Sequence, residues 1–148
     1  MDTETDTSDA TTDTRSGTRS GTRTDHNVWV GLSYDDPLSA RAWLRELGFD
    51  EGILVRDEAG AVEHSEMLWP EGGRVMVSSR ARGHDTFVSD ARAATVYVVV
   101  DDPDAVWQRA QGIGAVVDRP LEETDYGSRG FSVRDAEGNS WSFGSYAG

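Results

Sequence analysis

The sequence contains one pattern twice, at a spacing of 66 residues. The motif DDP at 35–37 recurs at 101–103, and the turn EG at 71–72 recurs at 137–138. Few other positions are identical, so the spacing of the turn and helix-start residues carries the argument. Such a repeat restricts the fold more than composition does, because both copies are expected to form the same structural unit.

Each copy opens with a strand and a helix. The runs VWVGLSY at 28–34 and ATVYVVV at 94–100 place aliphatic residues at alternate positions, which predicts strands with one apolar face. The aspartate and proline of each DDP motif then predict a helix N-cap and first turn. We expect these helices to end at Gly48 and Gly114. Their apolar residues recur with helical spacing, so each helix can cover its own sheet.

Three further strands complete each copy. We expect them at 52–57, 62–69 and 73–80, and again at 115–119, 128–134 and 140–146. The predicted fold class is therefore α+β, with two tandem β-α-β-β-β modules.

Residues 1–26 are a segment of a different kind, rich in Thr, Asp, Ser, Arg and Gly. This composition cannot bury enough apolar surface to offset the entropy of ordering, so we expect a disordered, acidic tail. Its three evenly spaced arginines leave a phosphate-binding arm as the alternative to a solubilising tail. The expected folded part is one domain at 27–148, with modules at 27–80 and 93–148 and a linker at 81–92.

Composition limits the partners of this chain. The formal net charge is −13, from 27 acidic and 14 basic residues, which argues against nucleic acid or an anionic membrane surface as a partner. No apolar run approaches the ~20 residues of a membrane helix, and no apolar signal core is seen near the N-terminus, so we expect a cytoplasmic protein. Cysteine is absent, which excludes disulfides, thiolate zinc sites and a cysteine nucleophile.

The segment YGSRGFSVRDAEGNSWSFG at 126–144, with the DDP helix starts and the paired modules, resembles the vicinal oxygen chelate superfamily. This superfamily includes glyoxalase I, bleomycin-resistance proteins and extradiol dioxygenases. The resemblance covers residues 27–148. It implies two curled, mixed sheets whose concave faces form a central cleft, often in a homodimer.

In the metal-using members of that superfamily, the first and last strands of each module hold a divalent ion. The resemblance places Trp29 and Thr95 at the first-strand positions, and Met76 and Ser142 at the last-strand positions. A hard divalent cation needs carboxylate or imidazole donors, which these four side chains do not offer. We therefore expect no metal and no cofactor, which argues against lyase and dioxygenase chemistry because both depend on Lewis-acid activation.

Alternation along the strands places aromatic, soft and polar side chains together on the expected cleft. Such a mixture suits a partly aromatic organic ligand, with rings for stacking and polar groups for orientation. The alternative is that these side chains fill a closed core. The predicted ligand-binding residues are Trp29, His64, Glu66, Met76, Thr95, Tyr97, Arg134 and Ser142.

His64 and Glu66 are an ionisable pair on this cleft. They lie two positions apart on one strand and so point the same way, whereas their repeat mates Gly130 and Ser132 are small. Three interpretations are open: a hydrogen-bonded pair that orients a ligand, a solvent-exposed pair, or an acid-base or makeshift metal site. Nucleophilic catalysis has weak support, because no GxSxG motif is present.

The sequence as a whole favours a metal-free protein that binds a small organic molecule, similar to the bleomycin-resistance branch, and that sequesters or senses its ligand as a homodimer. One alternative is a glyoxalase-like or dioxygenase-like enzyme with a metal site rearranged around His64 and Glu66. Another is a structural dimer whose cleft is closed.

Overall fold

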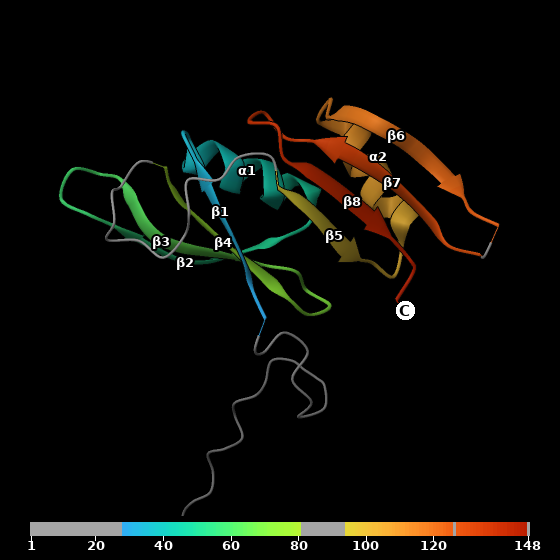
Figure 1. The fold of residues 1–148 in the computed structure, drawn as a ribbon, viewed down its shortest axis with the longest axis horizontal. Helices are drawn as coiled ribbons and strands as arrows, with labels where there is room; N and C mark the ends of the chain where they lie inside the picture. The colour runs from blue at the N-terminus through green and yellow to red at the C-terminus, as the bar shows by residue number, and fades with distance from the viewer. Residues whose placement is uncertain (1–27, 81–93, 126, 148) are drawn as a thin grey trace, which may run out of the picture.

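The computed structural model describes residues 28–80, 94–125 and 127–147. This part of the chain forms two modules with the same order of strands and helix (Figure 1). Module 1 contains β1 (Val30–Tyr34), α1 (Pro37–Leu47), β2 (Asp50–Arg56), β3 (Val62–Leu68) and β4 (Arg74–Ser79). Module 2 contains β5 (Thr95–Val99), α2 (Pro103–Gly112), β6 (Val116–Glu123), β7 (Arg129–Arg134) and β8 (Ser140–Gly144). The predicted α+β fold with two tandem β-α-β-β-β modules is confirmed.

Each module forms its own four-stranded mixed sheet. The strand order is β1-β4-β3-β2 in module 1 and β5-β8-β7-β6 in module 2. The first and last strands of each module are parallel, and the other neighbouring strands are antiparallel. Parallel strands need a crossover connection, which the helix and the intervening hairpin provide in both modules. The repeat in the sequence is therefore a repeat in topology.

The two helices begin as predicted. Asp36 and Asp102 are the N-caps, and each carboxylate accepts a hydrogen bond of 3.1 Å from the backbone N–H three residues later. A proline follows each cap at the start of the helix. Gly48 caps the end of α1 with a φ of 123°, and Gly114 lies just after α2 with a φ of 68°. Glycine suits both positions because it adopts positive φ without strain.

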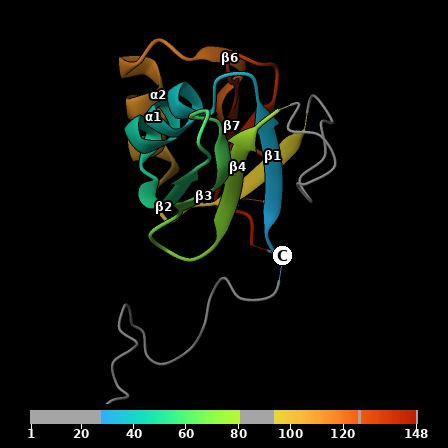
Figure 2. The same cartoon turned by 90° about the vertical axis from the view of Figure 1, so that its left-hand side faces the viewer.

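The two modules share one hydrophobic core. Figure 2 shows α1 and α2 packed side by side. The ring of Phe49, which follows α1, lies 5.0 Å from that of Trp69 and 5.9 Å from that of Trp141, centre to centre. Trp69 in turn lies 6.1 Å from Phe143. Because Trp141 and Phe143 belong to β8, these aromatic contacts cross from one module to the other.

The other side of each sheet faces away from the helices, and we call it the open face. On β3, Met67 is buried on the helix side, whereas His64 and Glu66 alternate with it and are partly exposed on the open face. In Figure 1, α2 lies behind the module 2 sheet, so the open face of that sheet points toward the viewer.

β6 is longer than predicted. The expected strand at 115–119 extends through Pro120 to Glu123. β6 is the edge strand of its sheet, and its register shifts on both sides of Arg119. Proline has no backbone N–H to donate, and an irregular edge strand does not require one at this position.

The predicted tail at 1–26 and linker at 81–92 lie outside the described residues. The bounds proposed for the domain and its modules therefore stay predictions. In the described segments, no helix is long and apolar enough to cross a membrane.

Candidate functional site

The eight predicted site residues lie on both open faces. Module 1 carries Trp29 just before β1, His64 and Glu66 on β3, and Met76 on β4. Module 2 carries Thr95 and Tyr97 on β5, Arg134 on β7 and Ser142 on β8. Each group is therefore positioned by its own sheet.

On module 1, four side chains form a connected group that we call the module 1 cluster: Trp29, His64, Glu66 and Arg74. Nε2 of His64 lies 2.8 Å from Oε2 of Glu66. Arg74 donates to Oε1 of Glu66 at 2.8 Å, and its guanidinium carbon lies 4.7 Å from the centre of the Trp29 ring. This is a cation–π contact between Arg74 and Trp29.

The carboxylate of Glu66 is fully engaged in this cluster. Its side chain is 13% exposed, and that of His64 is 31% exposed. Partial burial opposes ionisation of Glu66, but the hydrogen bonds from His64 and Arg74 outweigh it and hold the pKa of Glu66 below its ordinary value. Of the three interpretations of His64 and Glu66, the hydrogen-bonded pair describes the geometry.

Sequence reasoning missed Arg74. This residue lies two positions before Met76 on β4, so strand alternation alone assigns it to the same open face. Met76 itself lies beside Glu66 in the sheet register. The signal for Arg74 was therefore present in the sequence, although its contact with Trp29 depends on how β1 and β4 pair.

On module 2, Tyr97 packs against the backbone of Gly144 and donates a hydrogen bond of 2.8 Å to the carbonyl of Tyr146. Beside it is a hollow of about 100 Å³, which we call the module 2 hollow. Its lining residues are Tyr97, Arg119, Thr124, Ser128, Gly130, Phe143, Gly144 and Tyr146. Of the eight predicted site residues, Tyr97 is the one that lines this hollow.

The other predicted residues of module 2 have local partners or face solvent. Arg134 pairs with Asp118 through two hydrogen bonds, of 2.7 and 3.3 Å, across the β6–β7 pair. Oγ of Ser142 lies 2.7 Å from Oγ of Ser132. Thr95 is exposed on β5. The structure therefore does not gather these three residues into one site.

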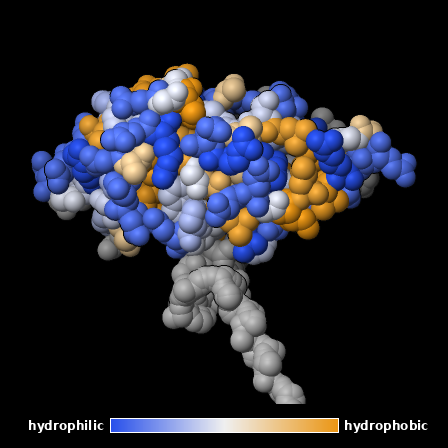
Figure 3. Space-filling view, turned by 180° about the vertical axis from the view of Figure 1, so that it is seen from behind, coloured by the Kyte–Doolittle hydropathy of each residue, from blue (hydrophilic) through white to orange (hydrophobic). Residues whose placement is uncertain are grey.

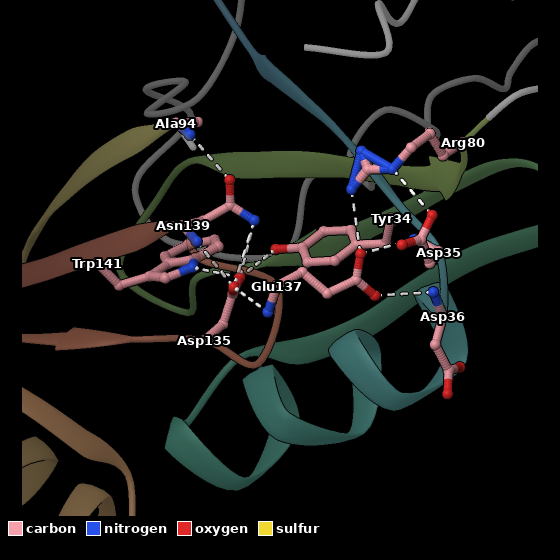
Figure 4. Close-up of polar contacts among 9 residues, drawn as sticks. All are labelled: Tyr34, Asp35, Asp36, Arg80, Ala94, Asp135, Glu137, Asn139 and Trp141. Carbon is pink, nitrogen blue, oxygen red and sulfur yellow. Dashed lines mark hydrogen bonds and ion pairs between the residues drawn. The ribbon is translucent and has the colours of Figure 1, made fainter. Parts of the chain in front are cut away.

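A buried polar group joins the two modules (Figure 4). Asp135, at 7% exposure, accepts hydrogen bonds from Oη of Tyr34 at 2.7 Å and from Nε1 of Trp141 at 3.1 Å. It also accepts hydrogen bonds from the backbone N–H groups of Glu137 and Asn139, and these bonds stabilise the DAEGN turn. Burial, followed by the charge of Asp135, raises the pKa of Tyr34 above its usual range. Tyr34 therefore stays a neutral donor to Asp135.

The EG turns of the repeat bind across the module boundary. Glu137 accepts the backbone N–H of Asp35 at 2.7 Å and that of Asp36 at 2.8 Å (Figure 4). In the opposite direction, Glu71 accepts the N–H of Asp101 at 3.0 Å. Each EG turn therefore contacts the DDP segment of the other module. We call these the reciprocal turn contacts, and they account for the recurrence of both motifs.

The two reciprocal turn contacts are unequal. The side chain of Arg80 is 6% exposed and donates at 3.0 Å both to Asp35 and to Glu137. Glu71 instead receives a hydrogen bond of 3.1 Å from Nε1 of Trp69, a residue of its own module. The contact made by Glu137 is therefore the stronger of the two, and this polar group holds the modules together.

The family model of the Glyoxalase/Bleomycin resistance protein/Dioxygenase superfamily matches residues 23–143. The chain belongs to this superfamily. The structure of TioX from Micromonospora sp. ML1 is similar to it, with a TM-score of 0.70, 29% identity, and coverage of 86% of this chain and 100% of TioX. A comparison with curated protein sequences gave no match.

Two further solved structures share the fold at lower identity. A glyoxalase / bleomycin resistance protein from Catenulispora acidiphila has a TM-score of 0.58 at 23% identity, covering 80% of this chain and 96% of that one. A lactoylglutathione lyase from Agrobacterium tumefaciens has a TM-score of 0.62 at 18% identity, covering 80% and 91%. At these identities the comparison establishes the fold alone.

The residues of this superfamily member do not fit the divalent ion of its metal-using relatives. The four expected ligand positions hold an indole, a thioether and two hydroxyls, at Trp29, Met76, Thr95 and Ser142. At the alternative position, the carboxylate of Glu66 already binds Arg74, and a divalent cation there would be repelled by the guanidinium. Among the described residues, no three His, Cys, Asp or Glu side chains form a group that could hold a metal.

Proposed function

We propose that this superfamily member binds a partly aromatic organic molecule on its open faces without a metal, and that it sequesters or senses that molecule. The observation that carries this proposal is the exposure of two aromatic rings, Trp29 at 39% and Tyr97 at 47%. Large rings are normally buried, so a partly exposed ring on the open face of a sheet presents apolar area on which a ligand ring can stack. Trp29 also stands where metal-using relatives are expected to place a ligand.

The module 1 cluster supports this proposal because it can both stack and orient a ligand. Glu66 holds the guanidinium of Arg74 against Trp29, so the indole has a partner that limits its motion. The side chain of His64, which contacts the other carboxylate oxygen of Glu66, is 31% exposed. A ligand that stacks on Trp29 would therefore meet a polar edge, and such an edge selects orientation.

The comparison with known proteins is consistent with a binding role. The matched superfamily includes bleomycin resistance proteins, and one of the similar structures carries that name. A protein of that kind needs a complementary surface and no reacting group. Binding alone would serve either sequestration or sensing, so the proposal covers both.

The same proposal extends to a homodimer. Edge strand β2 exposes Ile53, Leu54 and Val55 at 54%, 40% and 37%, and edge strand β6 exposes Val116 and Val117 at 61% and 41%. Figure 3 shows hydrophobic surface on the reverse of the molecule, toward its module 1 end. A second copy that covers such strands would bury apolar surface and protect the sheet edges.

Tryptophan fluorescence tests the proposed function. A screen of planar aromatic metabolites and antibiotics should find ligands that change the emission of Trp29, because Trp69 and Trp141 are 7% and 0% exposed. The Trp29→Phe variant should lose most of the signal, whereas the matched Trp107→Phe variant in α2 should keep it. Trp29→Ala should weaken binding by about 1 to 3 kcal/mol if the ring is an anchor. Ligands whose signal survives Trp29→Phe unchanged would contradict the proposal.

A further inference from the structure

We infer that the module 2 hollow is a binding site for a single aromatic ring that carries a carboxylate. This inference rests on the proposed function, because it assigns a chemical class to one end of the open-face ligand. It is carried by three observations on the hollow itself: two glycines that let Tyr97 pack closely, two tyrosines in the lining, and an arginine with weak partners.

Two glycines in the lining set the position of Tyr97. Gly130 and Gly144 are direct partners in the β7–β8 register. A Cβ atom on Gly144 would lie 2.9 Å from Oη and 3.2 Å from Cε1 of Tyr97, so a larger residue would displace that ring. A Cβ on Gly130 would lie 2.6 Å from the carbonyl of Phe143. The two glycines therefore let the Tyr97 ring lie directly against Gly144 and let the β8 backbone pass close to Gly130, which sets the position of Tyr97 in the lining.

Two tyrosines contribute to the lining of the hollow. Tyr97 and Tyr146 are 47% and 54% exposed, and the hydrogen bond from Oη of Tyr97 to the backbone carbonyl of Tyr146 holds the Tyr97 ring in place. The hollow, of about 100 Å³, is smaller than the ~150 Å³ cavity that accommodates benzene in an engineered core, but it is partly open to solvent. One ring would therefore fill it and project along the open face, and the hollow does not enclose a fused ring system.

Arg119 supplies the charge. It lies between the two register shifts of β6, and irregularities of this kind turn a side chain out of the regular pattern. Its guanidinium is 3.4 Å from Oγ of Ser132 and 3.5 Å from the carboxylate of Glu122, and its side chain is 46% exposed. Both contacts are long compared with the 2.7–2.9 Å of charge-assisted hydrogen bonds.

A carboxylate on the bound ring would be a better partner for Arg119, because the planar guanidinium can donate two parallel hydrogen bonds to it. The side chain of Glu122 is 50% exposed, so solvent screens its opposing charge. At the other end of the hollow, Thr124 and Ser128 bond to each other through two hydrogen bonds that involve Oγ1 of Thr124. Among the described residues that line the hollow, Arg119 is the one that carries a charge.

The test uses the full-length chain and two fluorinated probes observed by ¹⁹F NMR, 4-fluorobenzoate and the neutral 4-fluorobenzyl alcohol. We expect the benzoate to bind at least tenfold more tightly than the alcohol. Arg119→Gln should weaken benzoate binding at least tenfold and remove the preference. Arg129→Gln is the matched control: it makes the same change of charge on β7, but its side chain pairs with Asp104 on α2. It should bind benzoate as the wild type does.

Gly144→Ala should also abolish benzoate binding, and circular dichroism would show whether that variant is folded. Equal affinity for the two probes, an unchanged affinity in Arg119→Gln, or no binding to the wild type at millimolar probe would each overturn the inference. These outcomes are separate from the test of Trp29. If a Trp29-dependent ligand binds equally well to Arg119→Gln, the inference fails and the proposed function stands. If benzoate binds through Arg119 but no Trp29-dependent ligand exists, the inference stands and the part of the proposed function that relies on Trp29 fails.

Discussion

Truncation of the two turn glutamates should reveal how unequally the reciprocal turn contacts hold the modules together. The perturbation is Glu137→Ala, compared with Glu71→Ala at the equivalent position of the repeat. The two substitutions remove the same atoms from the same kind of turn, so the difference between them reports the partners that each glutamate contacts.

The magnitudes follow from those partners. Glu137 is 16% exposed and accepts hydrogen bonds of 2.7 Å, 2.8 Å and 3.0 Å, the last from Arg80, whose side chain is 6% exposed. Hydrogen bonds to charged groups contribute about 1.5–3 kcal/mol each, but water can replace the two backbone contacts at the surface, so we expect a loss of about 3 kcal/mol. Glu71 is exposed and accepts two longer bonds, of 3.0 and 3.1 Å, so we expect its truncation to cost about 1 kcal/mol.

Urea unfolding followed by circular dichroism measures both losses in the full-length chain. The slope of the transition should be unchanged, because neither substitution alters the surface exposed on unfolding. Arg80→Ala should cost nearly as much as Glu137→Ala, and the double variant should cost less than the sum, since the two side chains contact each other. Equal losses for Glu71→Ala and Glu137→Ala, or a larger loss for Glu71→Ala, would refute this reasoning.

Three further predictions concern stability and assembly. Tyr34→Phe removes a buried hydrogen bond to Asp135 and should cost about 1–3 kcal/mol at neutral pH. Because folding raises the pKa of Tyr34, its contribution is full below pH ~10 and declines as the pH rises further, so melting curves from pH 8 to 12 should show a weaker alkaline loss in the variant. Arg41→Ala should cost about 3 kcal/mol in urea unfolding, since this residue, at 4% exposure, donates to three backbone carbonyls of β2 and β3, whereas exposed Arg45→Ala should cost under ~1 kcal/mol. Light scattering at micromolar concentration should give twice the mass of one chain, and a monomer would contradict the proposed dimer.

Much of the fold could be predicted because the repeated motifs mark the helix starts and the turns between strands. The DDP motifs place both helix starts, and the EG turns place both β-hairpins that lead into the last strands. Arg41 could not be predicted in the same way. Its position in α1 is compatible with either the solvent side or the sheet side, and its burial depends on carbonyls exposed by the register shift in β2.

The candidate site was less predictable because its groups come from different strands. Alternation along one strand correctly assigns His64 and Glu66 to the same face, and their hydrogen bond follows from that. Arg119 is different: it enters the module 2 hollow because β6 is irregular, which no simple period of two describes. Likewise, a local pattern gives no sign that Glu137 contacts residues about a hundred positions earlier.

The reciprocal turn contacts have a consequence for the origin of the chain. A half-length polypeptide with one module would already carry both a turn glutamate and a DDP segment. Two such polypeptides could form both reciprocal turn contacts around a two-fold axis, as isologous dimers do. Fusing the two copies keeps that geometry and frees each copy to change independently. Fusion permits asymmetry between the copies. Among the described residues, Glu137 has two partners that Glu71 lacks an equivalent of, the backbone N–H of Asp36 and the side chain of Arg80, and the two open faces carry different groups.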